Sequence, residues 1–421
     1  MTGLLNGMTS GAVWMAIAAI FARGAPLLYS IIIARTLGKE AAGQFSIVQN
    51  TGLLVLALTA PGLHTVATKE FAQRNAKGGI GKSQVGSVML AAWLMGLIGS
   101  AALVLTADWI VAKVLLSDSA LTVAIRIGGG LLVLFGTVSA VGSGALIGLQ
   151  RLRSIATAQF ISGAVGVAAV SLGAAVAGVT GALVGFSAAY AVNYLMLQRG
   201  LGARAYASTL GADIAQVRHW VLMALPLSVS YGITAAGNWL TISALGRSAH
   251  GFGAVAMFSV GNQWQTAILF LPTALSVVLL PRLSRLLALR DAASFQHTFG
   301  AVLLTSLGLG IGGVFVVVIC ARPLLALYGP EFRDGETILR VIALGAIPVI
   351  FSNVTSQVLY ARGMLRASIW TQLPYAAALV ALALWLIPRY GALGLALATA
   401  GAHCVLAIAN GTAVAVERSA G

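Results

Sequence analysis

The chain has 421 residues, of which 59% are hydrophobic and only 8% are charged, and its mean hydropathy is +0.95. Too few side chains are polar to cover the surface of a soluble globular protein of this size. The composition therefore excludes soluble globular proteins and indicates a polytopic membrane protein. The net charge of +15 comes from short Lys and Arg clusters between apolar runs. Such clusters are typical of loops at an anionic membrane surface, and no nucleic-acid partner is expected.

Twelve apolar runs are long enough to cross about 30 Å of hydrocarbon, which takes roughly 20 helical residues. The sequence therefore predicts an all-α fold, and the longest polar connections, 199–219 and 281–298, leave no room for a domain outside the membrane. The predicted spans are 10–34, 42–66, 83–107, 120–149, 155–177, 181–198, 220–245, 254–280, 299–321, 335–360, 369–388 and 391–415.

Lys and Arg residues are unevenly divided between the two sides that these spans define. Fifteen follow the even-numbered spans, including the tail, and seven follow the odd-numbered spans. The positive-inside bias predicts that both termini lie in the cytoplasm. The N-terminus has no basic stretch or small-residue cleavage site, so its first helix is expected to be retained as a span.

The two halves of the chain repeat each other. Residues 45–50 (Phe-Ser-Ile-Val-Gln-Asn) return as 258–263 (Phe-Ser-Val-Gly-Asn-Gln), a shift of 213. The same shift relates Lys69 to Arg282 and Gln159 to Gln372, whereas the Gly-Ala-Leu triplets at 181–183 and 391–393 suggest a shift of 210 near the ends. We expect two six-helix lobes, 1–210 and 211–421, related by a parallel repeat, with substrate between them and alternating access as the mechanism.

Arg23 lies about midway between Ser10 and Arg35, which bound the first predicted span, and this places it near the centre of that span. An arginine at that depth costs at least about 2.5 kcal/mol, so it normally faces a wet cavity and marks a ligand path. The alternative is a structural arginine bonded to backbone carbonyls that Pro26 frees. Arg126 and Arg340 open spans 4 and 10 and either face the cavity mouth or extend to the membrane surface.

Side-chain amides are frequent within the spans. They are suited either to sugar hydroxyls or to hydrogen bonds between packed helices, and the sequence does not decide between the two. The amides expected at the substrate site are Gln49, Asn50, Asn238, Asn262 and Gln263.

Carboxylates are absent from the interiors of the predicted spans. Proton and cation relays usually depend on an intramembrane Asp or Glu, so a carboxylate-coupled cation exporter is disfavoured. The two cysteines and five histidines show no metal-ligand spacing, and no nucleotide motif is present. No metal, cofactor or covalent chemistry is expected.

Five short motifs occur in a defined order along the chain. They are Ala-Arg-Thr-Leu-Gly at 34–38, Gly-Gln-Phe-Ser at 43–46, Leu-Pro-Arg-Leu-Ser at 280–284, Ile-Pro-Arg-Tyr-Gly-Ala-Leu-Gly at 387–394 and Ala-Leu-Ala-Thr at 396–399. The whole chain thereby resembles the polysaccharide transporter branch of the MOP exporter superfamily, including O-antigen-type members of the bacterial inner membrane. The resemblance implies two six-helix lobes around a cationic cavity.

The resemblance also implies flipping of an undecaprenyl-pyrophosphate-linked oligosaccharide between the leaflets during lipopolysaccharide or other polysaccharide biosynthesis. By analogy with lipid II flippases, Arg23 would hold the pyrophosphate, helped by Arg126 and Arg340, while glycan polymerases or assembly proteins would be partners. The chain departs from those relatives in having twelve predicted spans rather than fourteen. A MATE-like multidrug antiporter and a lipid II flippase remain alternatives, as does a scaffold for glycan polymerases.

Overall fold

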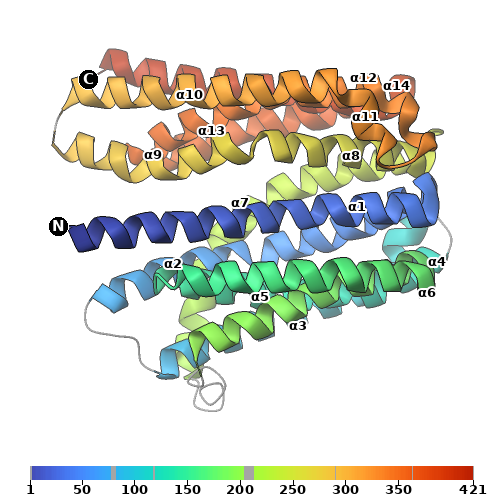
Figure 1. Cartoon of the computed structure of the whole chain (residues 1–421), viewed down its shortest axis with the longest axis horizontal. Coiled ribbons are helices and arrows are strands. Elements are labelled where there is room, and N and C mark those ends of the chain that lie inside the picture. Colours follow the sequence, from blue (N-terminus) through green and yellow to red (C-terminus); the bar gives the residue numbers. More distant parts are fainter. Residues whose placement is uncertain are drawn as a thin grey trace. The chain divides into compact units, whose positions relative to one another are not determined.

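The computed structural model describes the backbone of residues 2–76, 82–116, 119–202, 213–289, 291–362 and 364–420. Within those ranges it describes the side chains of residues 24–415, except 76, 82–83, 119, 230, 277–278, 280–281, 288 and 365–369. The described chain is helical and contains no strand (Figure 1). This outcome follows from the apolar composition, because a helix satisfies its own backbone polar groups in lipid.

The helices follow one another with short connections. In chain order they are α1 Thr2–Thr59, α2 Pro61–Ala76, α3 Lys82–Trp109, the π-helix η1 Ile110–Leu115, α4 Ser119–Ala124, the π-helix η2 Ile125–Gly129, α5 Gly130–Gly148, α6 Leu152–Leu201, α7 Ile214–Arg247, α8 Gly251–Ile268, α9 Phe270–Ala288, α10 Ala292–Ile319, α11 Ala321–Ala326, the 3-10 helix η3 Pro330–Gly335, α12 Glu336–Leu344, α13 Ala346–Ala361 and α14 Leu365–Ala420.

Seven described helices are long and apolar enough to cross a membrane, or eight if the two bent parts of α7 form one span. Three of the long helices, α1, α6 and α14, contain a non-helical break and therefore hold two predicted spans each. With α7 and the successive helices α8 and α9, the described helices cover all twelve predicted spans. The structure is consistent with that count, and the chain is a multi-pass membrane protein.

The chain divides into two compact units, Met1–Trp239 (the N-unit) and Leu240–Gly421 (the C-unit). The division falls within α7, because the first part of this helix packs on the N-terminal helices. The rings of Trp220 and Phe71 meet edge to face at 6.0 Å, and a Cβ on Gly62 would overlap the Ala224 carbonyl oxygen. The predicted lobes 1–210 and 211–421 follow the repeat instead and remain a prediction.

The chain folds back at each break. Residues 29 and 45 would lie about 24 Å apart along a straight helix. In the structure the rings of Tyr29 and Phe45 both contact Phe186, at centroid distances of 5.8 and 5.9 Å. Gly38, with φ of 83°, therefore marks a reversal between two antiparallel halves of α1.

The hairpins in α6 and α14 occupy equivalent positions in the two units. Gly178 breaks α6 with φ of 56°, and Gly391, its counterpart at the shift of 213, breaks α14 with φ of 55°. A Cβ on Gly181 would overlap the Gly173 carbonyl oxygen, and one on Gly394 would overlap that of Leu386, so these close approaches are related by the same shift. The expected shift of 210 near the ends is therefore wrong, because the turn positions and not the Gly-Ala-Leu triplets set the equivalence.

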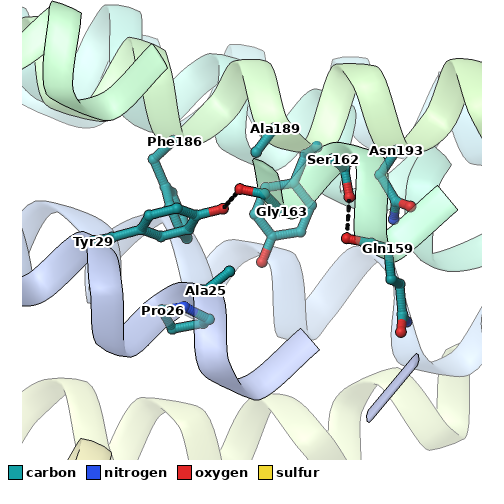
Figure 2. Close-up of a pocket in the computed structure, with 10 residues that line it drawn as sticks. Ala25, Pro26, Tyr29, Gln159, Ser162, Gly163, Phe186, Ala189 and Asn193 are labelled. Atoms are coloured by element: carbon teal, nitrogen blue, oxygen red, sulfur yellow. Dashed lines mark hydrogen bonds between the residues drawn. The ribbon is translucent and has the colours of Figure 1, made fainter. Parts of the chain in front are cut away.

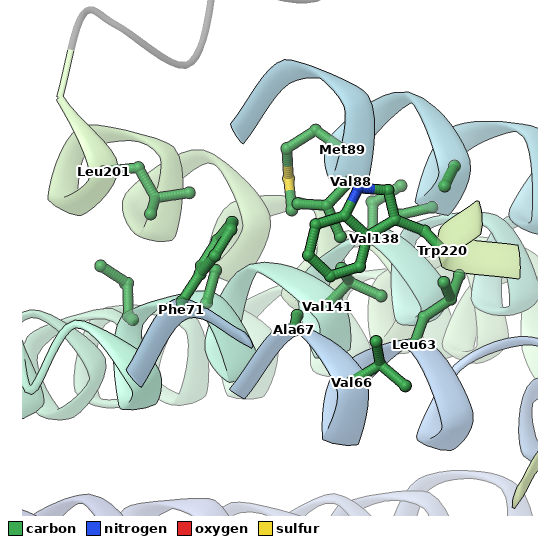
Figure 3. Packing of buried hydrophobic residues seen from close by; sticks show 14 of the residues in the cluster. Leu63, Val66, Ala67, Phe71, Val88, Met89, Val138, Val141, Leu201 and Trp220 are labelled. Atoms are coloured by element: carbon green, nitrogen blue, oxygen red, sulfur yellow. The ribbon is translucent and has the colours of Figure 1, made fainter. Parts of the chain in front are cut away.

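The N-unit is held together by a buried apolar cluster formed by α2, α3, α5, α6 and α7 (Figure 3). Leu63 and Phe71 of α2 pack with Val88 of α3, Val141 of α5 and Trp220 of α7, all of them nearly inaccessible. Because lipid is as apolar as these side chains, close packing rather than exclusion from water stabilises such a cluster. The cluster fixes α5 and α6, which carry most of the polar groups described next.

Candidate functional site

A cavity of about 250 Å³ lies between α1 and the two halves of α6 in the N-unit (Figure 2). Each half of α6 presents one face to it, because the lining positions are spaced three or four residues apart. The residues that line it are Ala25, Pro26, Tyr29, Gln159, Ser162, Gly163, Phe186, Ala189, Tyr190 and Asn193.

The cavity exists because the first half of α6 carries small residues where α1 approaches. The hydroxyl of Tyr29 donates a hydrogen bond to the Gly163 carbonyl oxygen at 3.4 Å. A Cβ on Gly166 would overlap the same hydroxyl oxygen, so no larger residue fits there without displacing the ring. Pro26 lies in the same helix as Tyr29 and removes one backbone hydrogen bond from α1 at the cavity wall.

One side of the cavity is aromatic. Phe186 is the centre of this wall, with Tyr29 at 5.8 Å and Tyr190 at 5.4 Å between ring centroids. Both contacts are edge to face, the geometry that aromatic quadrupoles favour. The wall therefore presents ring faces and two phenolic oxygens, a combination that suits the mixed polar and apolar surface of a sugar ring.

The opposite side carries amides. The side-chain nitrogen of Asn193 donates to the Ser139 hydroxyl at 2.7 Å, which leaves its carbonyl oxygen Oδ1 buried and without a partner. The Gln159 oxygen Oε1 is likewise buried without a partner, while the Ser162 hydroxyl donates to the Gln159 backbone carbonyl at 3.2 Å. Unpaired buried acceptors are costly, so these two oxygens favour a ligand that donates hydrogen bonds, such as a hydroxyl.

Among the residues whose side chains the structure describes, the lining is electrically neutral, because none of the ten that line the cavity carries a charge. Among the residues that the structure describes, no three His, Cys, Asp or Glu side chains lie together as a metal site would require. Arg23 precedes Pro26 by three residues in α1, and its side chain lies outside the described residues. The described cavity therefore offers hydrogen bonds and aromatic faces rather than ionic contacts.

The two other predicted arginines are exposed and paired with acids. Arg126 in η2 forms an ion pair with Asp108 at the end of α3. Arg340 in α12 bonds Glu336 at 3.1 Å, and the same carboxylate lies 3.8 Å from Arg322. These pairs offset part of the charge with which each arginine would attract an anion, and neither residue lines the N-unit cavity.

The predicted amides lie elsewhere in each unit. Gln49 and Asn50 are half-buried in the second half of α1, where the Asn50 nitrogen donates to the Ser46 carbonyl at 2.8 Å. Asn238 is half-buried beside Trp239, whose indole donates to the Thr51 hydroxyl at 2.9 Å. None of the three lines the cavity.

In the C-unit, Asn262 lines a narrow crevice with Gln265, whose nitrogen donates to the Ile342 carbonyl at 2.8 Å. Asn262 is exposed, and its neighbour Gln263 is half-buried. Gln49 and Asn50 thus lie on one helix of the N-unit, and Asn262 and Gln263 lie on one helix of the C-unit.

Sequence reasoning missed most of the cavity and noted Gln159 only as part of the repeat. A signal was available in the spacing of its residues. Positions 159, 162, 163 and 166 form one helical stripe of amide, hydroxyl and glycines, and positions 186, 189, 190 and 193 form a second stripe with the same spacing. What the sequence did not reveal is that a hairpin at Gly178 brings the two stripes face to face.

The position equivalent to this cavity in the C-unit is filled. At a shift of 213, Ser162 corresponds to Tyr375 and Tyr190 corresponds to His403. The Tyr375 and His403 rings pack at 4.9 Å, and Tyr375 belongs to a buried cluster with Leu379 and Leu406. One imidazole nitrogen, Nδ1, lies 2.8 Å from the Thr399 carbonyl oxygen in its own helix.

A sequence profile of the family described as "Polysaccharide biosynthesis protein" matches residues 8–287 of this chain. Among curated proteins, the chain is 28% identical over 154 residues to "EPS I polysaccharide export inner membrane protein EpsE" of Ralstonia solanacearum. It is also 28% identical over 141 residues to the protein of the same name from Ralstonia nicotianae. The matched segments span about a third of those proteins, 34% and 32% of their lengths.

Solved structures share the fold over nearly the whole chain. An inward-facing multidrug resistance MATE family transporter of the MOP superfamily superposes with a TM-score of 0.77, covering 97% of this chain and 98% of that one. The lipid II flippase MurJ in an inward closed conformation gives a TM-score of 0.76, covering 96% of this chain and 87% of that one. Both are 15% identical in sequence, a level at which the likeness establishes the fold alone.

Proposed function

This chain belongs to the family of polysaccharide biosynthesis proteins and has a MOP superfamily transporter fold, and on that basis we propose that it flips a lipid-linked oligosaccharide across the bacterial inner membrane. The proposed substrate is an oligosaccharide joined to undecaprenyl pyrophosphate, such as an O-antigen unit. Its sugars must cross the bilayer while its lipid remains in it. Transport by alternating access moves the sugars without breaking a bond.

The observation that carries the proposal is the neutral cavity of the N-unit. Sugar hydroxyls donate and accept hydrogen bonds, and the two unpaired amide oxygens of Gln159 and Asn193 would accept from them. The aromatic wall around Phe186 would meet the apolar faces of the sugar ring. A cationic drug would instead be expected to need a carboxylate, and none is present among the described residues that line this cavity.

Arg23 is proposed to hold the pyrophosphate. Arg23 lies three residues before Pro26, in the same helix as part of the cavity wall. Its position midway along the first predicted span supports a location near the membrane centre. Arg126 and Arg340 would contribute only by exchanging their carboxylate partners for the substrate. Five further amides would contact the sugars during transport: Gln49, Asn50, Asn238, Asn262 and Gln263. Both termini of the chain are proposed to lie in the cytoplasm.

The first experiment removes the arginine. We expect Arg23→Ala to abolish surface glycan in a strain that depends on this chain, while Arg23→Lys retains part of it because the charge remains. Membrane insertion and protein level, followed by blotting of the membrane fraction, should be unchanged in both. Full complementation by Arg23→Ala would refute the proposed role of this residue.

The second experiment removes the amides. Gln159→Leu and Asn193→Leu should each lower surface glycan roughly tenfold, because each deletes one buried hydrogen bond to the sugar. Gln372→Leu is the matched control, since it changes the same residue type at the equivalent C-unit position and lines none of the cavities described above. Equal losses in all three variants would indicate that the amides serve packing and not sugar binding.

The same strains separate the alternatives. A lipid II flippase would be essential for growth, so a viable deletion strain excludes that function. A multidrug antiporter would confer resistance on a sensitised host, and we expect no such resistance. The proposal requires three results together. The deletion strain is viable, its drug resistance is unchanged, and the wild-type gene restores its surface glycan.

A further inference from the structure

A second cavity, of about 430 Å³, lies in the C-unit between the end of α9 and the start of α10. Its walls carry a guanidinium, an imidazole and two hydroxyls beside two apolar side chains. The lining residues are Arg282, Leu286, Ala293, Ser294, His297 and Thr298. This headgroup cleft, as we call it, shares no residue with the N-unit cavity.

The cleft has an excess of positive charge. Arg282 is exposed and forms no ion pair within the described part of the chain. The nearest acid along the chain is Asp291, whose carboxylate caps α10 by accepting the Ser294 backbone N–H at 2.9 Å. That carboxylate lines the neighbouring cavity together with Arg362 rather than the headgroup cleft. An anion in the cleft would therefore meet Arg282 without a competing carboxylate among the described lining residues.

The cleft combines a cationic side chain with apolar side chains, as sites at a membrane surface do. Arg282 and Leu286 are one helical turn apart on α9, and Leu289, just beyond them, is 65% exposed. The connection between α9 and α10 follows an even-numbered span, where cations predominate and where the sequence predicts the cytoplasmic side. Basic pockets between transmembrane helices on that side suit the headgroups of anionic lipids.

We propose that the headgroup cleft binds the phosphate of an anionic membrane phospholipid. Arg282 would supply the principal charge, and His297 and the Thr298 hydroxyl would donate hydrogen bonds to the phosphate. The N-unit lacks this arrangement, because at the repeat shift of 213 the sequence has Lys69, Gln84 and Val85 in place of Arg282, His297 and Thr298. In α2 the next residue, Glu70, pairs with Arg74 at 3.3 Å. The lipid site is therefore specific to the C-unit and independent of the transported substrate.

The test uses the purified full chain in nanodiscs of phosphatidylcholine with and without phosphatidylglycerol. We expect phosphatidylglycerol to raise the Tm of the wild type and to remain bound in native mass spectrometry. Arg282→Ala should bind phosphatidylglycerol about fivefold more weakly, which corresponds to the about 1 kcal/mol that one cation near an anionic surface contributes. Arg282→Lys should retain most of the binding, and Thr298→Val should lose part of it.

Arg285→Ala is the matched control, because Arg285 lies on the same helix, is exposed and does not line the cleft. Binding that falls equally in Arg282→Ala and Arg285→Ala, or in neither, overturns the proposal. Inorganic phosphate is added in a separate arm, and a Tm increase equal to that from phosphatidylglycerol would show a soluble-phosphate site instead. The assay measures no transport, so its outcome is separate from that of the glycan experiments.

Discussion

The two units fold the same kind of helical hairpin and use its inner face differently. In the N-unit, α6 doubles back at Gly178 and leaves a cavity between Ser162, Tyr190 and α1. In the C-unit, α14 doubles back at Gly391, and the equivalent positions hold Tyr375 and His403 in ring contact. The duplicated backbone supplies the frame, while a few side-chain volumes decide which copy has room for a ligand.

The difference arises from the residues that face the centre of each hairpin. Gly163 and Gly166 leave space for the Tyr29 ring and for the cavity beside it. Their counterparts in the C-unit repeat are Ala376 and Leu379, and Leu379 is buried in the cluster with Tyr375. We therefore propose that the N-unit hairpin provides the cavity for a sugar, and we expect the C-unit hairpin to contribute stability.

The largest effect is expected when the N-unit cavity is filled as its C-unit counterpart is. Ser162→Tyr places the C-unit's tyrosine into the cavity, so we expect surface glycan to fall at least about tenfold because the sugar loses its space. Protein level in the membrane should remain close to that of the wild type, since an existing cavity takes up the new ring. Ser162→Ala, which keeps the space, should retain surface glycan, and transport that survives Ser162→Tyr would contradict the assignment.

The reciprocal exchange tests the C-unit. Tyr375→Ser empties a packed position in which the ring is 5% exposed, and we expect a loss of about 3 kcal/mol in the free energy of unfolding. Transport per folded molecule should change little. Denaturant unfolding in detergent, with Ser162→Ala as the N-unit control, measures the difference, and a stability equal to that of the wild type would show that the ring is not part of a packed core.

Alanine at Gly178 and at Gly391 is expected to destabilise the two hairpins to different extents. Both glycines have positive φ, so alanine at either costs about 2 kcal/mol of backbone strain. A Cβ on Gly178 meets nothing within 4 Å, whereas one on Gly391 would lie 2.7 Å from the His250 ring. Gly391→Ala should therefore lower the Tm more than Gly178→Ala. The reverse order would show that the His250 ring does not pack against Gly391.

The smallest expected effect concerns the start of α10. Hydrogen bonds from Ser294 lower the pKa of Asp291 below its ordinary value of 3.8, and the equivalent N-unit position is Gly78, which has no side chain to cap with. Because the folded pKa is lowered, this stabilisation is present above the ordinary value and is lost as the pH falls through the folded value. Asp291→Asn should remove that small acid dependence of the Tm, and an unchanged dependence would exclude the cap as its source.

Several features could be predicted from the sequence because they depend on local composition or period. The apolar runs predicted the helices, and the shift of 213 between Gln159 and Gln372 reappears in the structure as the shift between Gly178 and Gly391. Pro26 was expected to lie inside a span, and it lines the cavity. These inferences needed no knowledge of which helices meet.

The cavity itself could not be predicted in the same way, because it depends on contacts between distant positions. Asn193 is oriented by Ser139 on α5, and Tyr29 is oriented by Gly163 on α6, and both pairs are far apart in the chain. The sequence drew attention to Gln49 and Asn50 because they stand out in an apolar run. The structure places them outside the cavity lining and shows the Asn50 amide bonded to its own helix.

The most direct test of the proposed function is lipid translocation by the purified chain in liposomes that contain a fluorescent undecaprenyl-pyrophosphate oligosaccharide. Exposure of the fluorophore to an impermeant quencher reports the leaflet that the substrate occupies. We predict that the wild type exchanges the substrate between leaflets, and that Arg23→Ala and Ser162→Tyr do not. Exchange by the wild type no faster than in protein-free liposomes, or equal exchange by all three proteins, would contradict the account.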